Sequence, residues 1–258
     1  MSLSRIWITT GRLTIWAASF CIGLLLCGPV AAQKIQAFSS GGMGEAVPAP
    51  WRMVGLPGGK HPLPKLDIVS LDGERVLRIA GDKSYGSVVH DLSPVVPGPG
   101  SLLRWRWRLD QALLLTDLTR KDGDDSPLKV CVMFDLPLEK LGLVERSIMR
   151  IARSRTADFV PAATICYIWD HLLPVGTELP NVYSPRLHYV VMDSGEKKLR
   201  QWVKHERDVT ADFLRAFGRE TDVVPPVVGV LVGADSDNTA STSLGYVGDV
   251  TFTATPRP

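Results

Sequence analysis

The residue types best suited to chemistry in this chain are acidic and amide side chains gathered after an apolar segment near its C-terminal end. Asp235, Asp237 and Asn238 directly follow the apolar residues 227–234, and Asp249 lies in the next strand-like segment. Calcium takes about six to eight oxygen ligands, which carboxylates, amide oxygens and loop carbonyls supply without strict geometry. This pattern predicts a structural Ca²⁺ site formed by Asp235, Asp237, Asn238 and Asp249.

A second acidic segment, residues 122–125, precedes the strand-like residues 129–135. Asp and Asn also begin turns, because their side chains accept hydrogen bonds from nearby backbone N–H groups. Neither acidic segment has the spacing of an EF-hand loop, which needs a distal glutamate. Turn formation therefore stays open beside metal binding for both segments.

Exposed tryptophans are another source of chemistry, because aromatic side chains line many ligand sites and offer flat surfaces for sugar rings. Trp169 is next to Asp170 at the end of a strand-like run, and Trp202 lies in the strand-like residues 199–208, between Gln201 and Val203. We expect Trp169 and Trp202 to form the platform of a carbohydrate-binding site. Trp105 and Trp107 alternate with arginines, which favours core positions for both rings.

Support for catalysis is thin. No serine stands in a Gly-x-Ser-x-Gly motif, and none of the five histidines has the spacing of a His-x-x-x-His or His-Glu-x-x-His zinc motif. Polysaccharide hydrolysis needs two carboxylates across a cleft, and with 27 acidic residues many such pairs are available but none is singled out. A polysaccharide hydrolase stays an alternative without assignable catalytic residues.

Cys131 and Cys166 each lie in a strand-like run and form an even pair beyond the N-terminal segment. In an exported protein such a pair is a candidate disulfide. Two buried free thiols acting as small apolar side chains are the alternative.

The first 32 residues have the features of a secretory signal peptide. Arg5 and Arg12 precede the apolar residues 13–27, and Val30-Ala31-Ala32 offers small residues for cleavage after Ala32. The apolar run is shorter than the roughly 20 residues that a transmembrane anchor needs. A lipoprotein would use Cys27, but Leu26 before it is bulky for such processing. We expect a periplasmic or secreted protein with no transmembrane anchor after cleavage.

Charge argues against nucleic acid as a partner. The chain has 29 basic and 27 acidic residues, and two of the basic residues are in the predicted signal peptide. The remaining chain is therefore formally neutral, whereas nucleic-acid-binding proteins carry a basic excess.

Short apolar runs separated by turn residues predict a mainly β fold, an antiparallel β-sandwich of jelly-roll type, formed by residues 33–258 as a single domain. Residues 103–109 show the clearest alternation, with Leu103 and the two tryptophans on one face and arginines on the other. The predicted strands are residues 75–80, 87–92, 102–110, 129–135, 164–170, 187–193, 199–208, 227–234 and 246–253, with a further early strand near 51–54.

Two segments predict helices. Residues 138–153 carry Leu141, Val144, Ile148 and Ile151 at helical spacing, so we expect these side chains to face the core and the arginines to face solvent, with contact to anionic lipid headgroups as the alternative for the arginines. Residues 210–217 form a shorter predicted helix, with its first turn capped by the residue at position 210 and its end set by the glycine at position 218.

Several segments taken together resemble the exported bacterial family called domain of unknown function 3047. The most specific of them are Asp235-Ser236-Asp237-Asn238-Thr239 and Tyr246-Val247-Gly248-Asp249-Val250-Thr251-Phe252. The resemblance spans roughly residues 51–252 and implies export, but no established activity. The closing strand is also similar to that of galactose-binding-like jelly rolls, many of which bind glycans and a structural calcium.

These features favour a non-catalytic, carbohydrate-binding type of module that takes a glycan or another envelope component. Two alternatives stay open. One is the polysaccharide hydrolase, and the other is a structural envelope protein whose protein partners the sequence does not specify.

Overall fold

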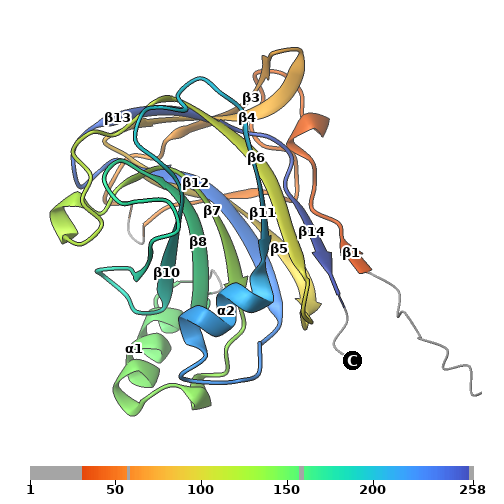
Figure 1. The fold of residues 1–258 in the computed structure, drawn as a ribbon, viewed down its shortest axis with the longest axis vertical. Coiled ribbons are helices and arrows are strands. Elements are labelled where there is room, and N and C mark those ends of the chain that lie inside the picture. Colours follow the sequence, from red (N-terminus) through yellow and green to blue (C-terminus); the bar gives the residue numbers. More distant parts are fainter. Residues whose placement is uncertain (1–30, 57–58, 157–159, 256–258) are drawn as a thin grey trace, which may run out of the picture.

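The computed structural model describes residues 31–56, 59–156 and 160–255 as a sandwich of two sheets, each of seven strands among these residues (Figure 1). The first sheet has the order β1-β14-β6-β13-β4-β3. Strands β14 and β13 pair with successive parts of one edge of β6, and β11 pairs with its other edge. The strands of this sheet are β1 (Ala31–Gln33), β3 (Lys65–Leu71), β4 (Glu74–Asp82), β6 (Leu102–Gln111), β11 (Val203–Asp208), β13 (Thr242–Val247) and β14 (Thr251–Ala254).

The second sheet has the order β2-β5-β12-β7-β8-β10-β9. Its strands are β2 (Arg52–Val54), β5 (Tyr85–Val95), β7 (Ser126–Phe134), β8 (Ala163–Asp170), β9 (Glu178–Pro180), β10 (Leu187–Ser194) and β12 (Val227–Asp235). The mainly β, jelly-roll-like prediction is confirmed. The expected antiparallel pairing needs one correction, because β8 and β10 run parallel.

Strand β6 shows how the sequence pattern specifies the sandwich. Its residues alternate between buried and partly exposed along nearly the whole strand. Trp105 and Trp107 lie in the core with exposed fractions of 3% and 0%, as their spacing predicts, while Arg104 and Arg106 point away from it. One buried cluster fills the space between the sheets and draws residues from Phe38 to Ala254.

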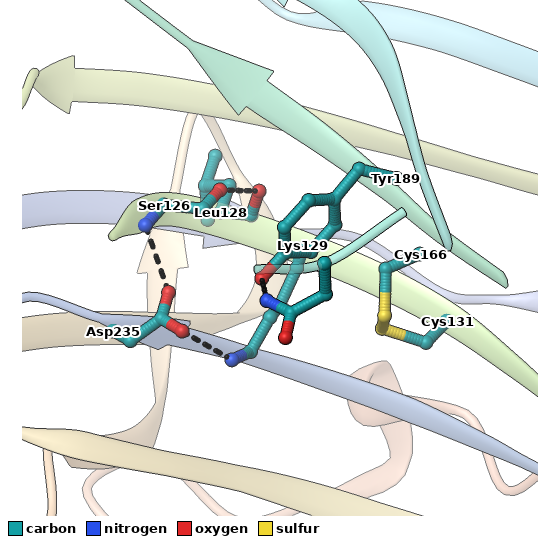
Figure 2. The surroundings of a disulfide bond; sticks show 8 residues. Ser126, Leu128, Lys129, Cys131, Cys166, Tyr189 and Asp235 are labelled. Carbon is teal, nitrogen blue, oxygen red and sulfur yellow. Dashed lines mark hydrogen bonds and ion pairs between the residues drawn. A yellow bond between two sulfur atoms is a disulfide. The ribbon is translucent and has the colours of Figure 1, made fainter. Parts of the chain in front are cut away.

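Cys131 and Cys166 are directly opposite each other on the antiparallel strands β7 and β8. Their sulfur atoms are joined in a disulfide bond, which lies beside the buried side chain of Tyr189 in a second, smaller apolar cluster (Figure 2). The bond connects residues 35 positions apart in the sequence. It therefore links two central strands of the second sheet.

The helix α1 (Leu143–Ser154) follows a short 3₁₀ turn, η3 (Leu138–Lys140), and connects β7 to β8. The predicted orientation of this helix is wrong. Val144, Ile148 and Ile151 are exposed to solvent at 74%, 59% and 51% of their surfaces. The guanidinium of Arg146 instead turns inward and donates hydrogen bonds to three backbone carbonyls, so the polar side of the helix faces the protein.

The second helix, α2 (Val209–Phe217), packs Phe213 and Phe217 into the core. Its first turn is capped by Asp208, whose carboxylate accepts hydrogen bonds from the N–H groups of Thr210 and Ala211. The prediction that Thr210 caps the helix is therefore wrong, because its hydroxyl donates to the carbonyl of Gly98. Two further 3₁₀ turns are η1 (Phe38–Ser40) and η2 (Lys121–Gly123).

Most of the predicted signal peptide, residues 1–30, lies outside the described residues. The predicted cleavage point after Ala32 falls within β1, which pairs with β14 along the edge of the first sheet. No helix in the described part of the chain has the length and apolar composition needed to cross a bilayer.

Candidate functional site

The two acidic segments that stand out in the sequence meet at one corner of the sandwich. The carboxylate of Asp125 accepts hydrogen bonds from the backbone N–H groups of Asn238 and Thr239, at 3.2 and 2.7 Å. The Thr239 hydroxyl donates to the same carboxylate at 2.6 Å. Asp125 therefore holds the turn after β12, which is the structural role that Asp often has in loops.

Asp235 is buried at this corner and forms an ion pair with Lys129, with 2.9 Å between Nζ and Oδ2 (Figure 2). Its other oxygen accepts a hydrogen bond from the backbone N–H of Ser126 at 2.8 Å. Burial raises the pKa of Asp235 to about 6, although Lys129 opposes the rise. Burial disfavours the charge of Lys129, yet the carboxylate beside it holds the pKa of this ammonium above its ordinary value.

Asp249, the fourth predicted calcium ligand, lies elsewhere. It accepts hydrogen bonds from the N–H and the hydroxyl of Ser39, at 2.9 and 2.6 Å. Strand β13, roughly 17 Å long at the usual rise per residue, runs between the turn that follows Asp235 and the loop that holds Asp249. The four predicted ligands therefore do not converge on one point.

The donor set at the Asp235 corner does not suit a cation either. Both oxygens of Asp235 already accept hydrogen bonds, one of them from an ammonium that would repel a metal ion. In residues 31–56, 59–156 and 160–255, no group of three or more His, Cys, Asp or Glu side chains is arranged to hold a metal. The residues predicted to bind Ca²⁺ thus do not fit it.

Asp124 and Asp237 complete the corner, and each has one buried carboxylate oxygen without a hydrogen-bond partner in the described residues. The second oxygen of Asp124 accepts from the Asn181 amide at 2.6 Å, and that of Asp237 lies 3.5 Å from Nδ1 of His61. Burial is the largest cause that raises the pKa of both carboxyl groups. The carboxylates of Asp124 and Asp237 therefore become protonated at a higher pH than those of ordinary aspartates.

The two predicted tryptophan platforms have different environments. Trp169 has an exposed fraction of 1% and donates from Nε1 to the Gly195 carbonyl at 3.0 Å, so it is a core residue with no surface for a sugar ring. Trp202 is partly exposed. Its Nε1 donates to Asp72 at 2.9 Å, and the guanidinium of Arg106 lies 4.6 Å from its ring centre.

A pocket of about 600 Å³ opens where β6, β11 and β14 meet the loop that holds Asp249. Paired positions on β6 and β11 supply many of its charged side chains, since Arg104 is opposite Glu206 and Arg106 is opposite Lys204. Arg104 is paired with Glu206, whereas the ammonium of the exposed Lys204 has no hydrogen bond or ion pair to any residue that the structure describes. Sequence reasoning missed these residues, although the alternation in β6 places both arginines on one face.

The carboxylates that line this pocket all have partners. Glu74 is paired with Arg106, Glu206 with Arg104, and Asp249 accepts its two hydrogen bonds from Ser39. The pocket therefore offers fixed acceptors beside an ammonium that no described residue pairs with. Such a lining suits recognition by hydrogen bonds better than proton transfer.

Trp105 also lines the pocket, and its buried indole N–H has no hydrogen-bond partner among the described residues. Because the Trp105 ring points into the core, away from the outward side chains of Arg104 and Arg106, this N–H faces the interior of the sandwich and is not available to a ligand in the pocket.

A polar network lies behind the pocket, inside the sandwich. The buried carboxylate of Asp193 accepts hydrogen bonds from Trp107 Nε1 at 2.8 Å, His205 Nε2 at 2.8 Å and Lys198 Nζ at 2.7 Å. Burial alone would raise the pKa of Asp193, but these donors outweigh burial and lower it. The network fixes His205 on β11 between the outward residues Lys204 and Glu206, and so it stiffens the pocket wall.

The family model described as "Protein of unknown function (DUF3047)" matches residues 49–251. Among curated proteins, none matches this sequence.

Solved structures that are similar to this chain share little sequence with it. The tandem CBM22 domain of Xyn10C from Paenibacillus barcinonensis is 14% identical with a TM-score of 0.35, and the match covers 87% of this chain and 51% of that one. Endo-1,4-β-glucanase CelB2 is 13% identical with a TM-score of 0.42, covering 88% and 97%. Endoglucanase 3 of family GH12 from Trichoderma harzianum is 10% identical with a TM-score of 0.37, covering 81% and 98%.

Proposed function

The chain belongs to the DUF3047 family, whose description assigns no activity, and we propose that it is a non-catalytic module that binds a carbohydrate-like ligand in the pocket beside β6 and β11. The observation that carries this proposal is the ammonium of Lys204, which has no partner among the described residues and lies among fixed, ion-paired side chains. A pocket of about 600 Å³ is within the range of roughly 300–1,000 Å³ common for small-molecule sites.

The lining matches the chemistry of a polyhydroxylated ligand. Hydroxyl groups both donate and accept hydrogen bonds, so they pair with ammonium and guanidinium donors as well as with carboxylate acceptors. Lys204 supplies free donors, while Glu206 and Asp249 supply oxygens in fixed positions. A sugar that also carries a carboxylate or sulfate would gain a charge-assisted hydrogen bond from Lys204.

Trp202 extends the site on the side of Arg106. Because Arg106 lines the pocket and also covers the Trp202 ring, a ligand that fills the pocket comes close to this indole. Arg106 and the hydrogen bond to Asp72 hold the ring in place, which lowers the entropy cost of stacking a sugar against it.

Export to the periplasm or the extracellular space is part of the proposal. The disulfide between Cys131 and Cys166 supports it, because such bonds persist in oxidising compartments. Fractionation of cells that express the full chain would test it, with the periplasm or medium as the expected location and the cytoplasm as the contrary result.

Binding to a panel of neutral and acidic oligosaccharides tests the function, with thermal stabilisation as a second readout. We expect a subset of glycans to bind and Lys204→Ala to weaken them, while Lys65→Ala, which removes another exposed lysine from the same sheet, leaves binding unchanged. Trp202→Ala should weaken the same glycans. An absence of binding and of stabilisation across the panel would overturn the proposal.

A further inference from the structure

The helix α1 presents its apolar side to solvent. Leu143, Val144, Ile148 and Ile151 are exposed at 78%, 74%, 59% and 51% of their surfaces. On a helical wheel these side chains occupy one half of α1, with serines between them. In water such a face normally packs against the core of its own protein, so its exposure indicates a surface that binds a partner or a membrane.

Polar contacts keep α1 in this orientation. Arg146 donates hydrogen bonds to the carbonyls of Leu138, Glu139 and Leu141, and Arg153 donates to the carbonyl of Val160 at 2.9 Å. These arginines occupy the protein-facing side of the helix, where Met149 is buried.

The charges left free on α1 and at its C-terminal end are positive. The side chains of Arg150 and Arg155 are exposed, and their guanidinium groups have no hydrogen bond or ion pair within the described part of the chain. The acidic residue of α1, Glu145, lies 3.4 Å from the guanidinium of Arg186 and is thereby neutralised. Residues 139–155 contain five basic and two acidic side chains.

We propose that α1 docks on the surface of an anionic lipid bilayer. An exposed apolar face flanked by arginines is the arrangement of helices that lie in the plane of a membrane, with apolar side chains in the headgroup region and cations against the phosphates. Each such cation contributes about 1 kcal/mol, or about fivefold in affinity, at an anionic surface. A second copy of the chain fits less well, because the free arginines beside the two apolar faces would repel one another.

The position of α1 suits this role. It lies with α2 at one end of the sandwich, beyond β7 and β8 (Figure 1). No residue of α1 lines the pocket beside β6 and β11, so bilayer contact leaves the pocket lining intact.

Vesicle flotation tests the proposal with the full chain, using phosphatidylglycerol-containing vesicles against pure phosphatidylcholine vesicles. Because the apolar residues 13–27 are present in every variant, binding is compared between variants. We expect Val144→Asp with Ile148→Asp to lower affinity for anionic vesicles by about 100-fold or more, since it removes apolar burial and adds negative charge. Arg150→Gln with Arg155→Gln should lower it about 30-fold and reduce its salt dependence.

Matched controls separate this surface from general stickiness. Leu172→Asp with Val175→Asp changes two equally exposed apolar residues outside α1 and should leave vesicle binding unchanged. Hydrogen exchange of peptides from residues 143–155 gives a local readout, with protection expected on anionic vesicles. Equal flotation of wild type and the Val144→Asp, Ile148→Asp variant, with no protection of α1, would overturn the proposal. Self-association or a captured protein that the same variant abolishes, without vesicle binding, would also overturn it.

Discussion

Lys129 and Asp235 face each other 2.9 Å apart between strands β7 and β12, with 7% and 6% of their side chains exposed. This pair occupies the corner where the sequence pattern predicts calcium, and its charges already balance each other. The corner is therefore a structural element of the second sheet.

Breaking this ion pair from one side should destabilise the protein strongly. Lys129→Met leaves a buried carboxylate without a counter-charge, and we expect a loss of about 3–5 kcal/mol in the free energy of unfolding. Combining Lys129→Met with Asp235→Asn should cost less than Lys129→Met alone. Urea denaturation of the four proteins in this double-mutant cycle measures the coupling, and additive losses would contradict the pairing.

The pH dependence of stability should carry the signature of Asp235. Its pKa is about 6 in the folded protein against an ordinary value of 3.8, so the folded protein binds the proton more readily than the unfolded chain. This group therefore costs stability above about pH 6, and the cost disappears as the pH falls towards 4.

Comparison with Asp235→Asn isolates this contribution from the rest of the corner, where Asp124 and Asp237 also have raised pKa values. We expect the stability of wild type relative to Asp235→Asn to increase between pH 7 and 4, by an amount on the order of 2–3 kcal/mol. Unfolding free energies that run parallel across this range would show that Asp235 is not perturbed.

Removing the disulfide should lower stability without changing the fold. The loop between Cys131 and Cys166 spans 35 residues, and the chain-entropy argument gives roughly 3–4 kcal/mol for a loop of this length. The double variant Cys131→Ala, Cys166→Ala should therefore melt several degrees lower. Mass spectrometry after alkylation checks the bond itself, since reduction should expose two additional thiols, and an unchanged number would exclude the bond.

Calcium removal should leave the melting temperature unchanged. Asp249 is held by Ser39 at a distance from the other predicted ligands, and Asp235 is held by Lys129. A cation bound to the folded state at 100 times its dissociation constant would add about 2.7 kcal/mol. Melting curves in excess Ca²⁺ and in chelator should thus coincide, and an upward shift in calcium that Asp237→Ala abolishes would restore the metal site.

Local patterns in the sequence predicted the sandwich well where one face of a strand is apolar. In β6 the alternation around Trp105 and Trp107 fixes which side chains are buried, because side chains on a strand point to opposite faces in turn. The orientation of α1 could not be predicted in this way. Its periodicity gives an apolar and a polar side, but Arg146 reaches three carbonyls and turns the polar side inward.

The candidate site was harder to predict, because residues close in sequence order can be far apart in the fold. Asp237 and Asp249 are separated by the full length of β13, whereas Asp125 and Thr239 meet across more than a hundred residues. The pocket depends on the pairing of β6 with β11, which brings Arg106 opposite Lys204. No sequence signal specifies that register.

The most direct test of the proposed function is calorimetric titration of the tightest-binding oligosaccharide from the panel into wild type, Lys204→Ala and Lys65→Ala. The pocket beside β6 and β11 predicts measurable binding by wild type and Lys65→Ala, with affinity reduced about tenfold or more in Lys204→Ala, since hydrogen bonds to a charged group contribute about 1.5–3 kcal/mol. Equal affinity in all three proteins would contradict the account, because the ligand would then bind elsewhere on the molecule.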